Sequence, residues 1–107
     1  MLKRAAHPGE ILKDELAEIG VTPTELARQI DVPPNRMSQI INGKRSITGD
    51  TALRLAHWFN TDPQFWMNLQ TQFDLVAADK EAGAAIKTLP TSQASQEGSG
   101  QPGMRQG

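Results

Sequence analysis

Residues 22–48 read TPTELARQIDVPPNRMSQIINGKRSIT, and this stretch contains the signals for two short helices joined by a tight turn. Thr22 can cap the first helix with its hydroxyl, and a proline suits the first helical position after it. Glu25 stands three residues after the cap, as in a capping box. Asp31 and Val32 then form the turn. The stretch therefore predicts a pair of helices in a helix-turn-helix arrangement.

The second helix of this pair is predicted to begin at Pro34, because a proline at the first position sacrifices no helical hydrogen bond. It is predicted to end at Asn42, before a glycine. With about 100° of rotation per residue, Met37, Ile40 and Ile41 share one face. The opposite face, about 140° to 200° from Met37, consists of amides. These amides are Asn35, Gln39 and Asn42.

An outer face made of amides is unusual for a helix that only meets solvent, where Lys and Glu are the common choices. Asn and Gln can bond adenine bidentately in the major groove, and Arg can do the same to guanine. We therefore predict that Asn35 and Gln39 contact DNA bases. For Arg36 and Ser38, which flank the amides, base contact and a solvated surface stay open as equal alternatives.

The charge distribution favours DNA locally, although the whole chain does not. The net charge is -1, whereas domains that bind nucleic acids are usually basic. Residues 28–54, however, hold five basic side chains against two acidic ones. Lys44 and Arg45 follow the second helix directly, where flexible cations meet phosphates rather than bases. We predict phosphate contacts from these two residues, and from the helix caps Thr22 and Thr48, whose neighbouring backbone N–H groups can bind anions.

Three further helices are predicted from capping residues and from apolar side chains at 3.6-residue spacing. One precedes Gly20, one runs from Thr48 to Asn60, and one runs from Pro63 through Val76. The fold class is therefore all-α, with five helices in one domain that covers residues 7–79. Residues 80–107 turn to small and polar side chains, and we expect them to be a flexible, disordered tail.

The fifth predicted helix carries more large apolar side chains than one neighbouring helix can cover. Most of them must belong to the core, and some are expected to meet a second copy of the protein. The residues predicted for this dimer interface are Phe65, Trp66, Leu69, Phe73 and Val76.

Other classes of function find little support in the sequence. The chain has no cysteine, and His7 and His57 are too few and too far apart for a metal site, so no metal and no cofactor are expected. No catalytic constellation or phosphate-binding glycine loop is present, so we expect no enzyme activity. No apolar run approaches the roughly 18 residues of a membrane span, and the N-terminus lacks a signal peptide, so we expect a cytoplasmic protein.

The stretch from Glu25 to Thr48 resembles the Cro and lambda-repressor class of helix-turn-helix proteins, also called the XRE family. More narrowly, HPGEIL near the N-terminus, the NGKR and IT elements, and NTDPQFWMNLQTQFDL look like the HigA-type antitoxins of toxin-antitoxin modules, in their VapI-like subgroup. This similarity covers about residues 7–76 and includes stand-alone relatives with no toxin.

The resemblance implies a lambda-repressor-like domain that represses its own operon as a homodimer on a palindromic operator. It also implies neutralisation of a RelE-like, HigB-like toxin that cuts messenger RNA. Asn35, Arg36 and Gln39 match positions that commonly read bases, and phosphate-contacting positions match Lys44, Arg45 and Thr48.

Two positions depart from the family pattern. Asp31 stands where the turn usually has glycine, although Asp tolerates the left-handed conformation. Pro33 stands where Ser or Thr usually caps the recognition helix, which removes a cap and a phosphate contact. The departure at Pro33 bears on DNA affinity rather than on the fold.

The sequence thus predicts a dimer that presents two recognition helices about one DNA turn, roughly 34 Å, apart. Two alternatives remain: a stand-alone transcriptional repressor without a toxin partner, and a protein-interaction module that uses this fold without DNA.

Overall fold

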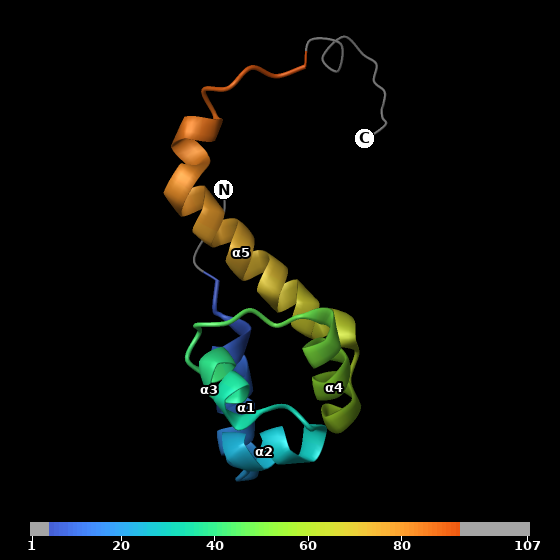
Figure 1. The fold of residues 1–107 in the computed structure, drawn as a ribbon. Helices are drawn as coiled ribbons and strands as arrows, with labels where there is room; N and C mark the ends of the chain where they lie inside the picture. The colour runs from blue at the N-terminus through green and yellow to red at the C-terminus, as the bar shows by residue number, and fades with distance from the viewer. Residues whose placement is uncertain (1–4, 93–107) are drawn as a thin grey trace.

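The computed structural model describes residues 5–92, and these residues form five α-helices with no strand among them (Figure 1). The helices are α1 Pro8–Ile19, α2 Pro23–Ile30, α3 Pro34–Ile41, α4 Gly49–Phe59 and α5 Pro63–Ile86. The predicted all-α class, the number of helices and the helix-turn-helix formed by α2 and α3 are confirmed.

Three helices end at a residue in the left-handed conformation. Gly20 after α1 has φ 74°, Asp31 after α2 has φ 60°, and Asn60 after α4 has φ 59°. Glycine, Asp and Asn are the residues that adopt this conformation at least cost. The sequence therefore ends each of these helices where the chain must turn back.

The helices pack so that α3 rests on α1 and α2, while α5 rests on α4 and α1. The α1–α3 contact depends on Gly9, because a Cβ atom at this position would lie 1.9 Å from the carbonyl oxygen of Ile40. Only a glycine allows the start of α1 to approach the end of α3 this closely.

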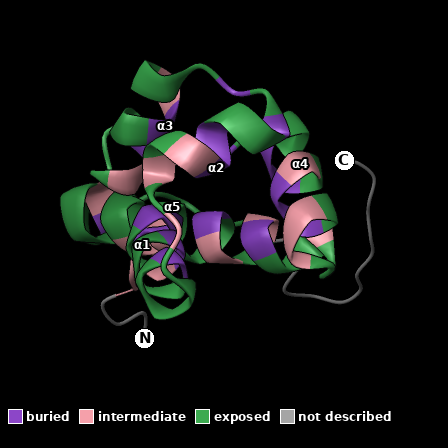
Figure 2. Ribbon diagram, turned by 90° about the horizontal axis from the view of Figure 1, so that it is seen from below, coloured by how far each residue is buried: buried purple, intermediate pink, exposed green. Residues whose placement is uncertain are grey.

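One hydrophobic core joins all five helices. Leu12 and Leu16 from α1 belong to one cluster with buried residues of α2, α3 and α4, and the largest of the core side chains, Trp66, comes from α5. Two core residues lie outside the helices: Val32 in the turn between α2 and α3, and Ile47 in the loop before α4. Figure 2 shows the buried positions facing the interior of this assembly.

α5 is longer than the sequence predicted. The expected domain boundary after residue 79 falls inside this helix, which continues to Ile86. Alanine is the best helix former, and KEAGAAI at residues 80–86 is rich in it, so the small side chains here extend a helix instead of starting a tail. Residues 93–107 of the predicted tail lie outside the described residues. In Figure 1 the C-terminal half of α5 extends beyond the other four helices.

None of the helices in the described part of the chain is long and apolar enough to cross a membrane.

Candidate nucleic-acid interface

α3 has one buried and one exposed face, as the helical spacing of its residues predicted. Met37 and Ile40 are fully buried. Asn35, Ser38 and Gln39 are exposed on the other side, and Arg36 beside them is half-buried. Since the buried face fixes the helix against the core, the four candidate base-contacting side chains are held on the outside of the molecule.

The turn before α3 is held by its backbone and by one apolar side chain. The N–H group of Val32 donates to the carbonyl of Ala27 at 2.9 Å, and the Val32 side chain is buried. Pro33 occupies the N-cap of α3 and makes no side-chain hydrogen bond there. The structure therefore confirms that the recognition helix lacks a side-chain cap, as the sequence predicted.

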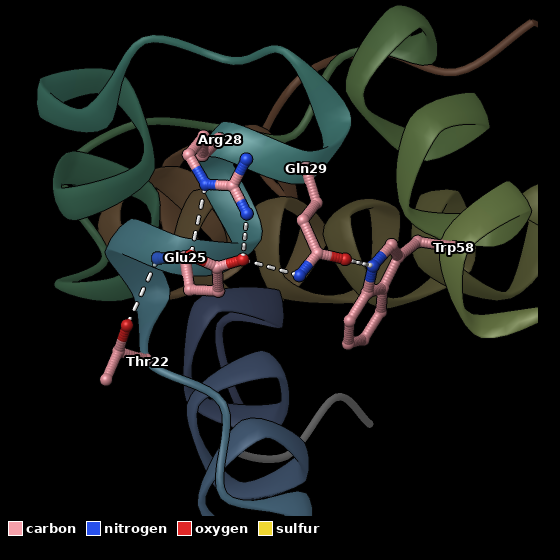
Figure 3. Close-up of polar contacts among 5 residues, drawn as sticks. All are labelled: Thr22, Glu25, Arg28, Gln29 and Trp58. Atoms are coloured by element: carbon pink, nitrogen blue, oxygen red, sulfur yellow. Dashed lines mark hydrogen bonds and ion pairs between the residues drawn. The ribbon is translucent and has the colours of Figure 1, made fainter.

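α2 is capped as expected, but its capping box is used differently. The Thr22 hydroxyl accepts a hydrogen bond from the Glu25 N–H at 3.1 Å. The Glu25 carboxylate, instead of turning back to the cap, accepts from Arg28 and from the Gln29 amide, and Gln29 in turn accepts from the Trp58 indole at 2.7 Å (Figure 3). Hydrogen bonds to Arg28 and Gln29 lower the pKa of Glu25. This chain of contacts ties α2 to α4.

The loop after α3 places the predicted phosphate-contacting cations beside the amide face. Gly43 turns the chain with φ 76°, and Lys44 and Arg45 that follow it are exposed. The Arg45 Nε donates to the Gln39 Oε1 at 2.8 Å. A candidate base-contacting residue and a candidate phosphate-contacting residue are thus joined by a hydrogen bond. The sequence did not predict this contact, because it assigned the helix and the loop separate roles.

The two capping threonines remain exposed at their helix starts. Thr48 accepts from the Thr51 N–H at 3.4 Å and so caps α4, while Thr22 caps α2 as described. Both positions place N-terminal N–H groups at the surface, where an anion would be stabilised.

A polar contact from α5, which was not predicted from the sequence, holds the end of the loop after α3. Gln70 is buried, its Oε1 accepts from the Ile47 N–H at 2.7 Å, and its Nε2 donates to the Asp74 Oδ1 at 2.9 Å. A signal for it exists in the sequence, because Gln70 stands four residues after Trp66 and so on the same, buried side of α5.

His7, which the sequence argued against as a metal ligand, has a structural role at the start of α1. Its Nδ1 accepts from the Gly9 N–H at 2.9 Å and caps α1, and its ring meets the edge of Phe73 with the centroids 4.8 Å apart. Burial lowers the pKa of His7, and Glu10, Asp74 and a hydrogen bond to the Arg45 backbone partly oppose this shift. The neutral ring is the form that can accept the capping hydrogen bond.

The residues predicted for a dimer interface fall into three groups by their exposure. Trp66 is only 2% exposed and lies in the core against Phe59, so its assignment to a dimer surface is wrong. Helical spacing alone does not show which of the several apolar sides of α5 packs against α4. Phe65 is exposed, while the remaining three are half-buried in the single chain. They are Leu69, Phe73 and Val76.

A pair of helices that packs one face on the core, presents amides on the outer face of its second helix and carries cations in the adjoining loop defines a small protein of the helix-turn-helix class. The family model described as "Helix-turn-helix" matches residues 12–66. A solved structure of an addiction module antidote protein of the HigA family from Coxiella burnetii is 46% identical, with a TM-score of 0.81, over 84% of this chain and 99% of that one. PA4674 from Pseudomonas aeruginosa, solved in complex with its operator DNA, is 40% identical with a TM-score of 0.80, over 85% of this chain and 98% of the other.

Among curated proteins, the virulence-associated protein I of Dichelobacter nodosus is 42% identical over 89 residues, which make up 82% of each chain. The present chain therefore belongs to the helix-turn-helix family and, within it, to the group of the HigA-type antitoxins. The relatives found are regulators, antitoxins and virulence-associated proteins rather than enzymes.

Proposed function

We propose that this protein is an antitoxin that represses its own operon as a homodimer on a palindromic operator. The observation that carries the DNA-binding part is the exposed face of α3, where Asn35 and Gln39 stand opposite the fully buried Met37 and Ile40. These exposed amides contribute nothing to the packing of α3 on the core, so packing does not account for them.

The neighbouring loop supports the same proposal. Lys44 and Arg45 are exposed next to α3, and Arg45 already reaches the Gln39 side chain. In this proposal Asn35, Arg36, Ser38 and Gln39 face base edges in the major groove. The phosphates meet Thr22, Lys44, Arg45 and Thr48, which fix the register without reading sequence.

The partner part of the proposal rests on similarity to the HigA-family antidote from Coxiella burnetii. We infer that the protein neutralises a small RelE-like, HigB-like toxin, and that it works in the cytoplasm, associated with the nucleoid through its operator. A second copy would dimerise along the apolar side of α5 that the core leaves uncovered, at Phe65 and near Val76.

Co-expression with the adjacent gene tests the toxin, and a shift assay on the upstream DNA tests repression. We expect a small basic protein to co-purify with this chain, and the pair to shift a fragment that contains an inverted repeat. A DNA shift without any co-purifying protein would instead support the stand-alone repressor. Absence of salt-dependent binding to any DNA at low ionic strength would overturn the DNA-binding function and leave a protein-interaction module.

A further inference from the structure

The exposed loop residues Lys44, Arg45 and Ser46 lie between two points that the rest of the fold holds in place. At the far end the Ile47 N–H donates to the buried Gln70 Oε1 at 2.7 Å. The near end, at Gly43, lies against the His7 ring, since a Cβ atom at Gly43 would meet the ring Cγ at 3.7 Å. Three exposed residues are therefore bounded by two anchored ones, and within the loop the Lys44 N–H also donates to the Gln39 carbonyl at 2.8 Å.

The orientation of the Gln70 amide is fixed at both of its ends. Asp74 presents a carboxylate, which only accepts, so the Gln70 NH₂ group must face it, and it does so at 2.9 Å. The Gln70 oxygen is then directed at Ile47, whose side chain is itself only 2% exposed. A buried N–H without a partner is costly, so an apolar side chain at position 70 could fill the space but could not hold this segment of backbone.

The anchors come from elements that do not themselves present the candidate DNA contacts. Gln70 and Asp74 belong to α5, and His7 caps α1 while its ring packs against Phe73, also of α5. Holding the loop before it meets a phosphate reduces the ordering cost at binding.

We propose that Gln70 is a positioning residue for the phosphate contacts of the Lys44–Ser46 loop, acting through its hydrogen bond to Ile47, and that Asp74 orients it. This inference rests on the proposed DNA-binding function and extends it to α5. In the folded protein, loss of the Gln70 contact releases the Ile47 end of the loop, while the Lys44 N–H still donates to the Gln39 carbonyl at 2.8 Å, so the loss falls on the residues nearest Ile47, Arg45 and Ser46.

The test compares Gln70→Leu with Gln72→Leu, because Gln72 is an exposed amide on the same helix and makes a matched control. The double variant Gln70→Glu/Asp74→Asn exchanges donor and acceptor between the two side chains. The new carboxylate can accept from the Ile47 N–H and from the new amide, and the net charge is unchanged, so this variant should restore the contact. Asp74→Ala, at an exposed position, is the milder variant should Gln70→Leu fail to fold.

Two readouts are needed: amide hydrogen exchange at Ile47 in the free protein, and DNA affinity at several salt concentrations. Each phosphate contact contributes about 0.9 to the log–log salt slope. For folded Gln70→Leu we expect at least about tenfold faster exchange at Ile47 and a salt slope flatter by about 1, with operator and random DNA weakened by the same factor. Asp74→Ala should change both readouts in the same direction by less. Gln72→Leu should match the wild type, and the double variant should recover at least half of each loss.

Wild-type slope and wild-type exchange in folded Gln70→Leu, with DNA binding intact, would overturn the positioning role and leave the proposed function standing. If Gln70→Leu does not fold, the same result in Asp74→Ala carries that conclusion. Absence of DNA binding by the wild type would overturn the proposed function itself, whatever the exchange at Ile47.

Discussion

The proposed base contact of Gln39 is constrained by its hydrogen bond to Arg45. Arg45 Nε donates to the Gln39 Oε1, which has two lone pairs and can accept a second hydrogen bond, and the Gln39 NH₂ group stays free to donate to a base. Bidentate recognition of adenine needs both ends of the amide. The Arg45 contact therefore leaves both ends of the Gln39 amide available to adenine, while it restricts the directions in which the amide can turn.

The first prediction separates base from phosphate contacts with Gln39→Ala and Lys44→Ala. Gln39→Ala should cost about 1 to 3 kcal/mol on the operator and relax its specificity, because a base reader is lost. Lys44→Ala should weaken all sequences alike and flatten the salt slope by about 1, because only a phosphate contact is lost. Titration of operator and random DNA at several salt concentrations distinguishes the two. Equal losses on both DNAs from Gln39→Ala would contradict its assignment as a base-reading residue.

At the scale of elements, the sequence predicted helix starts and ends better than it predicted contacts between helices. Local signals place the caps, so Thr22, Thr48, Gly20 and Asn60 were identified correctly from their own neighbourhoods. The exposed face of α3 was also predictable, because the face on which a helical residue lies depends only on its spacing in the sequence.

Contacts between distant segments were not predictable in the same way. The spacing from Trp66 could place Gln70 on the buried side of α5, but its hydrogen-bond partner Ile47 lies 23 residues away in the chain. The Trp58 contact with Gln29 likewise joins residues 29 apart. The burial of Trp66 depends on which side of α5 meets α4. In each case the deciding partner lies on another element, and no local pattern records it.

The second prediction concerns the close approach of α1 to α3. Gly9→Ala places a methyl group against the backbone of Ile40, which cannot move aside as a side chain would. We expect it to destabilise the fold by about 1 to 3 kcal/mol, the range for overpacking. Gly49→Ala is the matched control at the start of α4, where no atom lies within 4 Å of the added group. It should be neutral or stabilise by less than about 1 kcal/mol.

Denaturant unfolding followed by circular dichroism measures both variants. Equal free energies of unfolding for the two alanine variants would contradict the close approach of α1 to α3 at Gly9.

At the scale of the whole molecule, the surface that should form the dimer is the uncovered side of α5. Leu75 is 50% exposed there, beside the half-buried Val76. Leu53 on α4 is also exposed, at 62%, but lies in a groove between α2 and α4 that includes Trp58 and Arg54. The two leucines are therefore comparable in exposure and differ in location.

The third prediction uses this difference. Leu75→Glu should convert the dimer to a monomer, because a carboxylate in an apolar interface is costly, and should weaken operator binding strongly because one monomer contacts only one half-site. Leu53→Glu should leave the dimer intact. Sedimentation of both variants at matched concentration gives the result. Persistence of the dimer in Leu75→Glu would move the interface away from this part of α5.

The continuity of α5 has a thermodynamic consequence. One unbroken helix carries Trp66 in the core, Gln70 behind the loop and Leu75 on the outside. A second chain or a toxin could bind α5 near Leu75 and make the helix more rigid around Gln70. If it does, it raises the affinity of the protein for DNA by some factor. Binding equilibria are reciprocal, so the DNA must then raise the affinity for that chain by the same factor. A short operator fragment would therefore act as an effector of assembly, which can be measured without any change to the protein.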